Sequence, residues 1–148
     1  MPDKKIQAER MADLTFELLE QCQIKREQMA ERLHLTVAEF KLLRGFREDE
    51  TLSVNDLAKR IDLSSSRLTR IIDGLVEKGL ARREIGSRDR RVMEISLTPK
   101  GKKVQEELEE TYVKTHLDIL DLLPQGADDS VILAMEKLRD AVKEWVKK

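Results

Sequence analysis

Hydrophobic residues recur every three or four positions over most of the chain, which is the spacing of amphipathic α-helices. The first such segment covers residues 4–33. Its pattern weakens over residues 21–28, which allows a bend or break there. Its apolar stripe consists of Met11, Leu14, Leu18 and Cys22.

Two further long helices are predicted at the other end of the chain. Thr98 followed by Pro99 has the form of a helix start, with threonine as the cap and proline in the first helical position. This helix should run toward Leu123, and the last one should begin near Asp128. The apolar residues of the last helix lie at near-heptad spacing: Val131, Ala134, Met135, Leu138, Ala141, Val142 and Trp145.

The middle of the chain contains shorter helices with capping signals. Thr36 with Glu39 predicts a capping box before a helix that ends at Arg47 and an acidic turn over residues 48–51, and Ser53 with Asp56 has the same spacing. The helix after Ser53 should end at Ile61, before a break at Asp62–Leu63. Ser64 then caps a helix to Lys78 that Gly79 ends, with an apolar stripe formed by Leu68, Ile71, Ile72, Leu75 and Val76.

After Gly79 the period changes from helical to alternating. Residues 81–85 and 91–97 are predicted to be two strands joined by an arginine-rich loop at residues 86–90. Two short helices, a tight turn and a charged hairpin describe a winged helix-turn-helix, whose second helix enters the major groove of DNA. The expected fold class is mainly α with a small β-hairpin wing (α+β).

Charge supports this interpretation. The 148 residues have a net charge of −1, yet residues 59–103 contain thirteen Lys or Arg against six acids. That segment is therefore +7 and the remainder −8, which indicates a binder of polyanions unless the segment is only a solvated helix face. The length indicates a single domain, and no apolar run approaches the roughly 20 residues that a membrane span needs.

The central motifs resemble the MarR (multiple antibiotic resistance regulator) family of winged-helix regulators. The resemblance rests on LSVNDLAKRI at residues 52–61, LSSSRLTRIIDGLVEKGL at residues 63–80 and REIGSRDRRVMEISLTPKG at residues 83–101. It implies a homodimeric bacterial or archaeal transcription regulator, usually a repressor that a small-molecule effector releases. Residues 1–148 would form one MarR-like domain, with a DNA-binding lobe at about 36–97 and intertwined dimerisation helices at about 4–33 and 98–147.

By position, the resemblance also implies the DNA-binding residues. In the wing, Asp89 would brace Arg91, which enters the groove, while Arg88 and Arg90 contact phosphates. Gly86 stands where many relatives carry an acidic residue, and it should loosen the wing tip. The residues of the second helix that would contact DNA are Ser64, Ser65, Ser66, Thr69 and Arg70.

Each of these sites has a plainer alternative. Ser64 caps its helix in either case, Ser66 and Arg70 are compatible with a solvated face, and the wing charges are compatible with a salt-bridged turn that binds nothing. Asp73 and Glu77 share the outer helix face and would repel phosphate, which limits base contacts to the first half of the helix.

No other chemistry is indicated by the sequence. Cys22 lies on an apolar stripe far from the only tyrosine, Tyr112, so it is interpreted as a buried small hydrophobe rather than a redox sensor. His34 and His116 lack metal-ligand spacing, and no catalytic constellation or cofactor motif is present. We therefore expect no enzyme activity, no metal and no cofactor.

The predicted partners are double-stranded DNA with a pseudo-palindromic operator, a second copy of the chain and a small-molecule effector, but no membrane. A single cysteine and a charged start of the chain favour the cytoplasm. The effector and its pocket residues are not readable from sequence. The alternatives are a winged-helix protein-interaction module without DNA binding and a regulator that needs no ligand.

Overall fold

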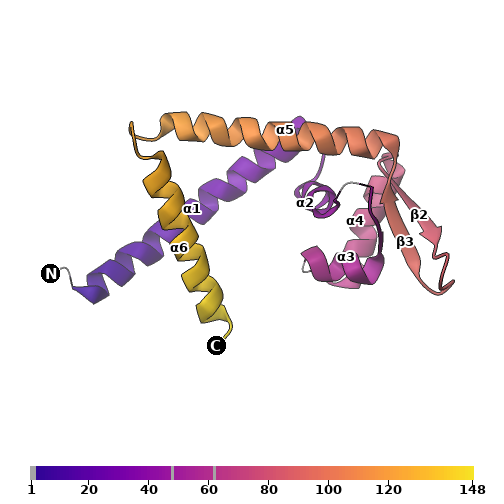
Figure 1. Cartoon of the computed structure of the whole chain (residues 1–148), viewed down its shortest axis with the longest axis horizontal. Helices are drawn as coiled ribbons and strands as arrows, with labels where there is room; N and C mark the ends of the chain where they lie inside the picture. The colour runs from indigo at the N-terminus through magenta and orange to yellow at the C-terminus, as the bar shows by residue number, and fades with distance from the viewer. Residues whose placement is uncertain (1–2, 48, 62) are drawn as a thin grey trace. The chain divides into compact units, whose positions relative to one another are not determined.

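The computed structural model describes residues 3–47, 49–61 and 63–148. The chain divides into two compact units, Met1–Thr111 and Tyr112–Lys148. Figure 1 follows the elements along the chain: α1 (Lys4–Arg32), α2 (Val37–Gly45), β1 (Thr51–Ser53), α3 (Val54–Ile61), α4 (Ser65–Glu77), β2 (Ala81–Ile85), β3 (Met93–Leu97), α5 (Pro99–Leu122) and α6 (Asp128–Val146).

The capping signals predict the helix starts correctly. Thr36 Oγ1 accepts the Glu39 amide at 3.1 Å and Glu39 Oε1 accepts the Thr36 amide at 2.9 Å, so the capping box is complete. Ser53 Oγ accepts the Asp56 amide at 3.1 Å at the start of α3. The bend allowed near residues 21–28 is absent, because α1 is one continuous helix. Asp62, part of the predicted break, lies outside the described residues.

The wing is a three-stranded antiparallel sheet in the order β1-β3-β2, not a simple hairpin. The sequence analysis missed β1, because a strand of three residues is too short to show a period of two. Leu52 of β1 lies opposite Ile95 of β3, whose other neighbour is Arg83 of β2. β3 begins at Met93 rather than at Arg91, since the two residues before it belong to the wing tip.

One hydrophobic core holds the elements of the first unit together. Its side chains come from α2, α3, α4, β3 and the first half of α5, so each element buries its apolar face against the others. Burying one such side chain stabilises the fold by about 1.5–3 kcal/mol. The largest fully buried members are Leu42, Leu43, Leu57, Leu68, Ile72, Leu75, Ile95 and Leu108.

The sheet joins α5 through a close backbone contact. The Thr98 amide donates to the Leu80 carbonyl at 3.0 Å, and its hydroxyl donates to the Gly79 carbonyl at 2.6 Å. The Thr98 hydroxyl also accepts the Gly101 amide at 3.0 Å, so Thr98 caps α5 as predicted. Gly101 lies so close to Leu80 that a Cβ at this position would be 1.9 Å from the Leu80 carbonyl oxygen.

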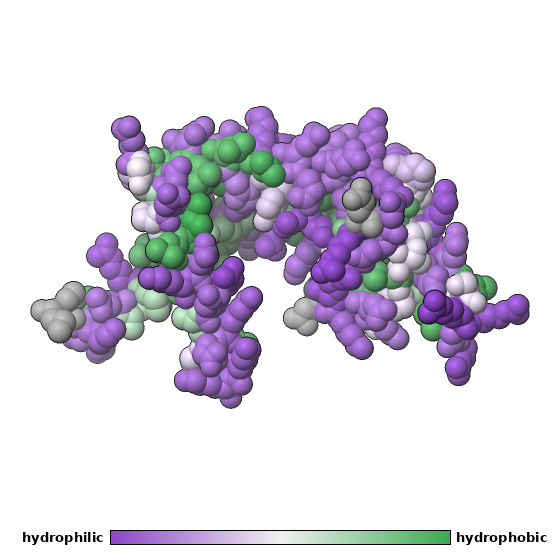
Figure 2. Space-filling view, viewed as in Figure 1, coloured by the Kyte–Doolittle hydropathy of each residue, from purple (hydrophilic) through white to green (hydrophobic). Residues whose placement is uncertain are grey.

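Large apolar side chains remain exposed in both units. In α1 only Met29 and Ala30 are buried, and within α6, whose residues are all described, none is buried. Figure 2 shows hydrophobic side chains gathered over the end of α5 and the start of α6. No helix in the described part of the chain has both the length and the apolar character to span a membrane.

Candidate nucleic-acid interface

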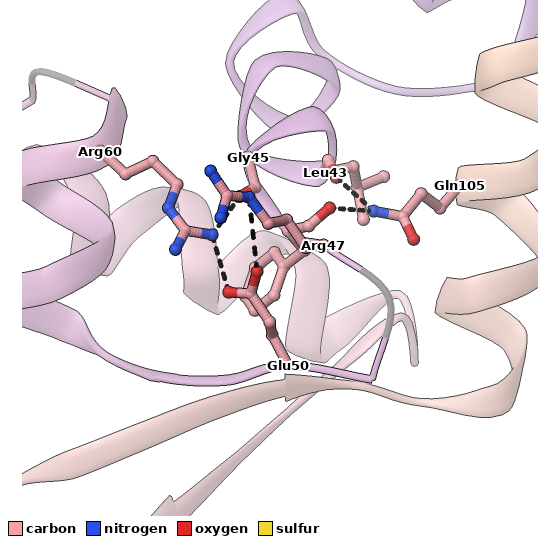
Figure 3. Close-up of polar contacts among 7 residues, drawn as sticks. Leu43, Gly45, Arg47, Glu50, Arg60 and Gln105 are labelled. Atoms are coloured by element: carbon pink, nitrogen blue, oxygen red, sulfur yellow. Dashed lines mark hydrogen bonds and ion pairs between the residues drawn. The ribbon is translucent and has the colours of Figure 1, made fainter.

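The helix-turn-helix consists of α3 and α4, and polar contacts fix the position of α3. Arg60 donates to the Gly45 carbonyl at 2.8 Å and to Glu50 Oε2 at 2.7 Å, and Arg47 lies 3.9 Å from the other Glu50 oxygen (Figure 3). These contacts tie α3 to the end of α2 and to the connection that leads into β1.

From the other side, α5 holds the same end of α2. The Gln105 amide group donates to the carbonyls of Leu43 at 2.8 Å and Phe46 at 2.7 Å (Figure 3). A helix leaves its last carbonyls without the usual intrahelical partners, and here the Leu43 carbonyl also accepts the Phe46 amide at 3.4 Å. A side chain of α5 therefore caps α2 from outside and sets its place in the lobe.

The first turn of α4 presents three serines to solvent. Ser64 is the N-cap, and its hydroxyl accepts the Arg67 amide at 3.4 Å and lies 3.4 Å from the Ser66 hydroxyl. Ser65, between them, is exposed too. Hydroxyls and free amides at a helix start are suited to contact phosphate oxygens, because the N-terminus also carries positive partial charge.

The rest of the outer face of α4 continues this surface. Thr69 and Arg70 are exposed, while Leu68 and Ile72 are fully buried on the opposite face. The Thr69 hydroxyl donates to the Ser65 carbonyl at 2.8 Å, which leaves its oxygen to accept a further bond. The helix thus turns its polar edge to solvent, as a major-groove helix must.

The predicted wing brace is present in the geometry. Asp89 accepts the Arg91 amide at 3.0 Å and the Arg91 Nε at 3.2 Å, with a third bond from Nη2 at 3.4 Å. The hydrogen bond from the Arg91 amide, followed by the bond from its side chain, lowers the pKa of Asp89 below its usual value. The Arg91 side chain is nevertheless 91% exposed. Arg88 and Arg90 are exposed beside it.

Gly86 closes the wing tip instead of loosening it. Its amide donates to the Val92 carbonyl at 2.8 Å, and the Val92 amide donates to the Asp89 carbonyl at 3.1 Å. A Cβ on Gly86 would lie 2.6 Å from the Asp89 carbonyl oxygen. The expectation of a looser tip was wrong, because the missing side chain is what lets the backbone of Asp89 and Val92 approach Gly86.

Two ion pairs of α4 were missed by the sequence analysis. Asp73 pairs with Arg83 of β2, and Glu39 of α2 accepts the Lys78 ammonium at 2.6 Å. Glu39 is almost fully buried, which raises its pKa, but the bonds from Lys78 and Thr36 outweigh burial and leave that pKa below its usual value. The sequence gives little indication of the Glu39–Lys78 pair, since the two residues are 39 positions apart.

A family model described as the MarR family matches residues 35–93, which contain α2, β1, α3, α4, β2 and the first residue of β3. The same region forms the helix-turn-helix and the wing. Over these residues the chain is similar to the MarR family.

Three proteins are similar to this chain over a longer stretch. The HTH-type transcriptional regulator YfiV of Bacillus subtilis is 29% identical over 120 residues, 76% of this chain and 73% of YfiV. The HTH-type transcriptional repressor MdtR of the same organism is 30% identical over 84 residues, 57% of this chain and 54% of MdtR. A structure of a MepR mutant from S. aureus, bound to an oligodeoxyribonucleotide, has a TM-score of 0.62 at 21% identity and covers 89% of this chain and 97% of MepR.

The match to the MarR family model and the similarity to HTH-type regulators support a DNA-binding transcription regulator. The structure confirms the predicted fold, mainly helical with a small β-sheet wing. The family is one of regulators rather than of enzymes. In the described residues, no group of three or more His, Cys, Asp or Glu is arranged to hold a metal ion. Cys22 is half-buried within its own chain, not fully buried as expected from its stripe.

The lobe also has a cleft of about 460 Å³ beside the end of α2. Its wall includes Gln105, which bonds the end of α2, and Glu50, which accepts a bond from Arg60, the other side chain that bonds that end. The other lining residues are Phe46, Arg47, Asp49, Leu97, Lys102, Glu106, Glu109 and Glu110.

Proposed function

We propose that this chain acts as a homodimer that binds a pseudo-palindromic operator and represses transcription until a small-molecule effector releases it. The observation that carries the proposal is one continuous exposed polar surface on α4, together with a wing in which Asp89 binds Arg91 while the Arg91 side chain remains exposed to solvent. The names of MdtR, a transcriptional repressor, and of the MepR structure with an oligodeoxyribonucleotide support the proposal by analogy.

Each predicted residue has a distinct role in this complex. Ser64 and Ser65 bind the phosphates that flank the major groove at the start of α4. Ser66 and Thr69 lie along the groove wall, and Arg70 donates to a guanine edge. Asp89 holds Arg91 for the minor groove, where the narrow walls concentrate negative potential. Arg88 and Arg90 bind phosphates on either side.

The exposed apolar residues are the basis for the homodimer. A monomer rarely leaves contiguous apolar surface as large as the stripes of α1 and of the second unit. A dimer formed by these stripes would carry two α4 helices, which an operator with two half-sites about one helical turn apart requires. We expect the whole chain, residues 1–148, to act as one MarR-like domain in that dimer.

The finer expectations follow from the same role. Control of transcription needs access to chromosomal DNA, so we place the protein in the cytoplasm, and we expect no catalytic turnover, cofactor or membrane partner. The cleft beside α2 is our candidate for the effector site, because about 460 Å³ is enough for a small organic molecule. A ligand there would contact Gln105 and Glu50 and so disturb the end of α2.

The test begins by selecting bound fragments from the source genome, and then measures competition between the selected operator and random DNA at two salt concentrations. Arg70→Ala should weaken the operator much more than random DNA, since a bidentate guanine contact is worth about 1–3 kcal/mol of discrimination. Arg91→Ala should weaken both DNAs more evenly and lower the salt slope by about one unit per protomer. Asp89→Ala should resemble a milder Arg91→Ala.

Lys41→Ala is the matched control, because Lys41 is an exposed cation of α2 outside the proposed interface. Lys41→Ala should leave the preference for the operator unchanged. Its salt slope should differ from that of the wild-type protein only slightly, because one distant positive charge is lost. Equal binding of operator and random DNA by the wild-type protein would overturn the proposed function. An unchanged affinity of Arg91→Ala for both DNAs would remove the wing from the interface and favour a protein-interaction role.

A further inference from the structure

The pair between Asp73 and Arg83 occupies an unusual place in the lobe. In an antiparallel pair, directly opposite residues point to the same face of the sheet. Arg83 is opposite Ile95, which is fully buried, and Ala81 is opposite Leu97, which is buried as well. Arg83 therefore extends from the core face of β2, where an apolar residue would be expected.

The partner of Arg83 lies on the DNA-facing side of α4. Asp73 follows Arg70 by three residues, so the two share one edge of the helix. The Asp73 side chain is 51% exposed and that of Arg83 is 35% exposed. The contact thus joins the outer edge of α4 to the first half of the wing, and the pair lies at the border of the surface assigned to DNA.

The charges of Asp73 and Arg83 would each affect DNA binding if the two side chains were not paired. An unpaired carboxylate beside Arg70 would repel the DNA backbone, and an unpaired Arg83 would attract the phosphates of any sequence. The pair cancels both effects. It also fixes the wing against α4, so that Arg70 and Arg91 meet DNA at a constant separation.

We infer that the Asp73–Arg83 pair is a specificity determinant: it holds α4 and the wing in register and withholds one arginine per protomer from non-specific DNA. The inference rests on the proposed DNA-binding function. Asp73 and Arg83 are positioning residues, because neither needs to touch DNA in the operator complex.

Asp73→Asn is the first test, with the selected operator and a random duplex of equal length as probes. The freed Arg83 should bind phosphates, so affinity for random DNA should rise and its salt slope should steepen by about one unit per protomer. For a dimer, the steeper slope means that the affinity for random DNA falls by about tenfold more between 50 and 200 mM salt than it does for the wild-type protein. Operator affinity should rise less or fall, since the wing is no longer fixed, so the preference for the operator declines.

Glu77→Gln is the matched control, because Glu77 is exposed on the same helix face one turn further on. It also removes one negative charge, so both DNAs should gain by a similar factor and the preference for the operator should be retained. Asp73→Glu, which keeps a carboxylate for Arg83, should behave like the wild-type protein in both preference and salt slope.

Arg83→Gln supplies a second, independent readout. If Arg83 is withheld from DNA, its loss exposes Asp73 and weakens both DNAs without flattening the salt slope. A slope flatter by about one unit per protomer would mean that Arg83 contacts phosphate in the wild-type complex, and would overturn the inference. Identical behaviour of Asp73→Asn and Glu77→Gln would also overturn it. Failure of the wild-type protein to prefer its operator would instead contradict the proposed function.

Discussion

Gly101 lies where the first turn of α5 passes the carbonyl group of Leu80. A side chain at this position would bring its Cβ to 1.9 Å from that oxygen, which leaves no room for any other residue. The contact belongs to backbone on both sides, so a flexible side chain cannot relieve it by moving. The lobe therefore depends on a glycine at a helical position where glycine is otherwise unfavourable.

We predict that Gly101→Ala lowers the free energy of unfolding, on the order of 1–3 kcal/mol, because backbone must move to admit the methyl group. A decrease in the free energy of unfolding is informative, since the same Gly→Ala exchange inside an unconstrained helix increases stability by up to about 1 kcal/mol. Urea unfolding of the two proteins measures the difference. Lys103→Ala, an exchange at an exposed position two residues on, should have little effect; a Gly101→Ala protein as stable as wild type would refute the close contact.

A second prediction for a single residue concerns Glu39 and the pH dependence of stability. Because its pKa is lowered in the folded state, its contribution to stability is present above its usual pKa of about 4.5 and is lost as the pH falls through the lowered value. Glu39→Gln should cost about 1–3 kcal/mol at pH 7, and the difference from wild type should shrink on acidification below pH 4.5.

Urea unfolding at pH 7 and at pH 3.5 tests the Glu39 prediction, since the second value lies about one unit below the usual glutamate pKa. Glu107→Gln on the exposed face of α5 serves as the control, and it should change stability little at either pH. A constant difference between wild type and Glu39→Gln across this range would show that the Glu39 charge does not contribute to stability.

Among the elements, α2 depends most on contacts from outside itself. It has nine residues, and its last carbonyls are satisfied by Gln105 of α5 and Arg60 of α3. A short helix is marginal alone, so tertiary contacts of this kind decide whether it forms. Through these hydrogen bonds, α2 links α3 to α5.

We predict that Gln105→Glu lowers the free energy of unfolding by on the order of 1–3 kcal/mol at neutral pH. The exchange preserves shape but replaces a donor with a carboxylate, which cannot donate to the carbonyls of Leu43 and Phe46. Glu106→Gln makes the reverse exchange at the neighbouring exposed position and should be nearly neutral. Thermal melting of both variants distinguishes the two cases, and equal melting temperatures would contradict the capping role.

At the level of elements, the sequence was most informative where local chemistry decides the structure. Capping residues and the alternation of apolar positions located α2, α3, α4 and the two long wing strands within a few residues. β1 was missed because its three residues are fixed by pairing with β3, a contact across more than forty positions. Arg83 was missed as a partner of Asp73 for the same reason: an ion pair between elements has no periodic signal.

For the whole molecule, the division into exposed and buried surface is the feature that the sequence predicted best. The resemblance implied dimerisation helices at both ends of the chain, and α6 has no buried residue in the single chain. Apart from the half-buried Asp89, the predicted DNA-binding residues are exposed. Their contacts with DNA remain a prediction, since base recognition depends on a partner with its own shape.

We predict that removal of residues 128–148 gives monomers or aggregates with weak DNA binding, because the deleted helix carries part of the proposed dimer surface. Leu138→Glu should loosen the dimer without removing a helix, whereas Lys137→Glu at the adjacent position should not. Sedimentation of each protein provides the measurement. A truncated chain that remains a well-defined dimer would place the interface elsewhere.

The long first helix has a mechanical consequence. At roughly 1.5 Å per residue, the 29 residues of α1 make a rod about 43 Å long. Only its last turn is embedded, at Met29 and Ala30, next to the corner where His34 takes a left-handed backbone and Thr36 begins α2. The corner is therefore the place where the direction of α1 is set relative to the lobe. It lies a few residues from Glu39, whose carboxylate accepts the Lys78 ammonium at the end of α4.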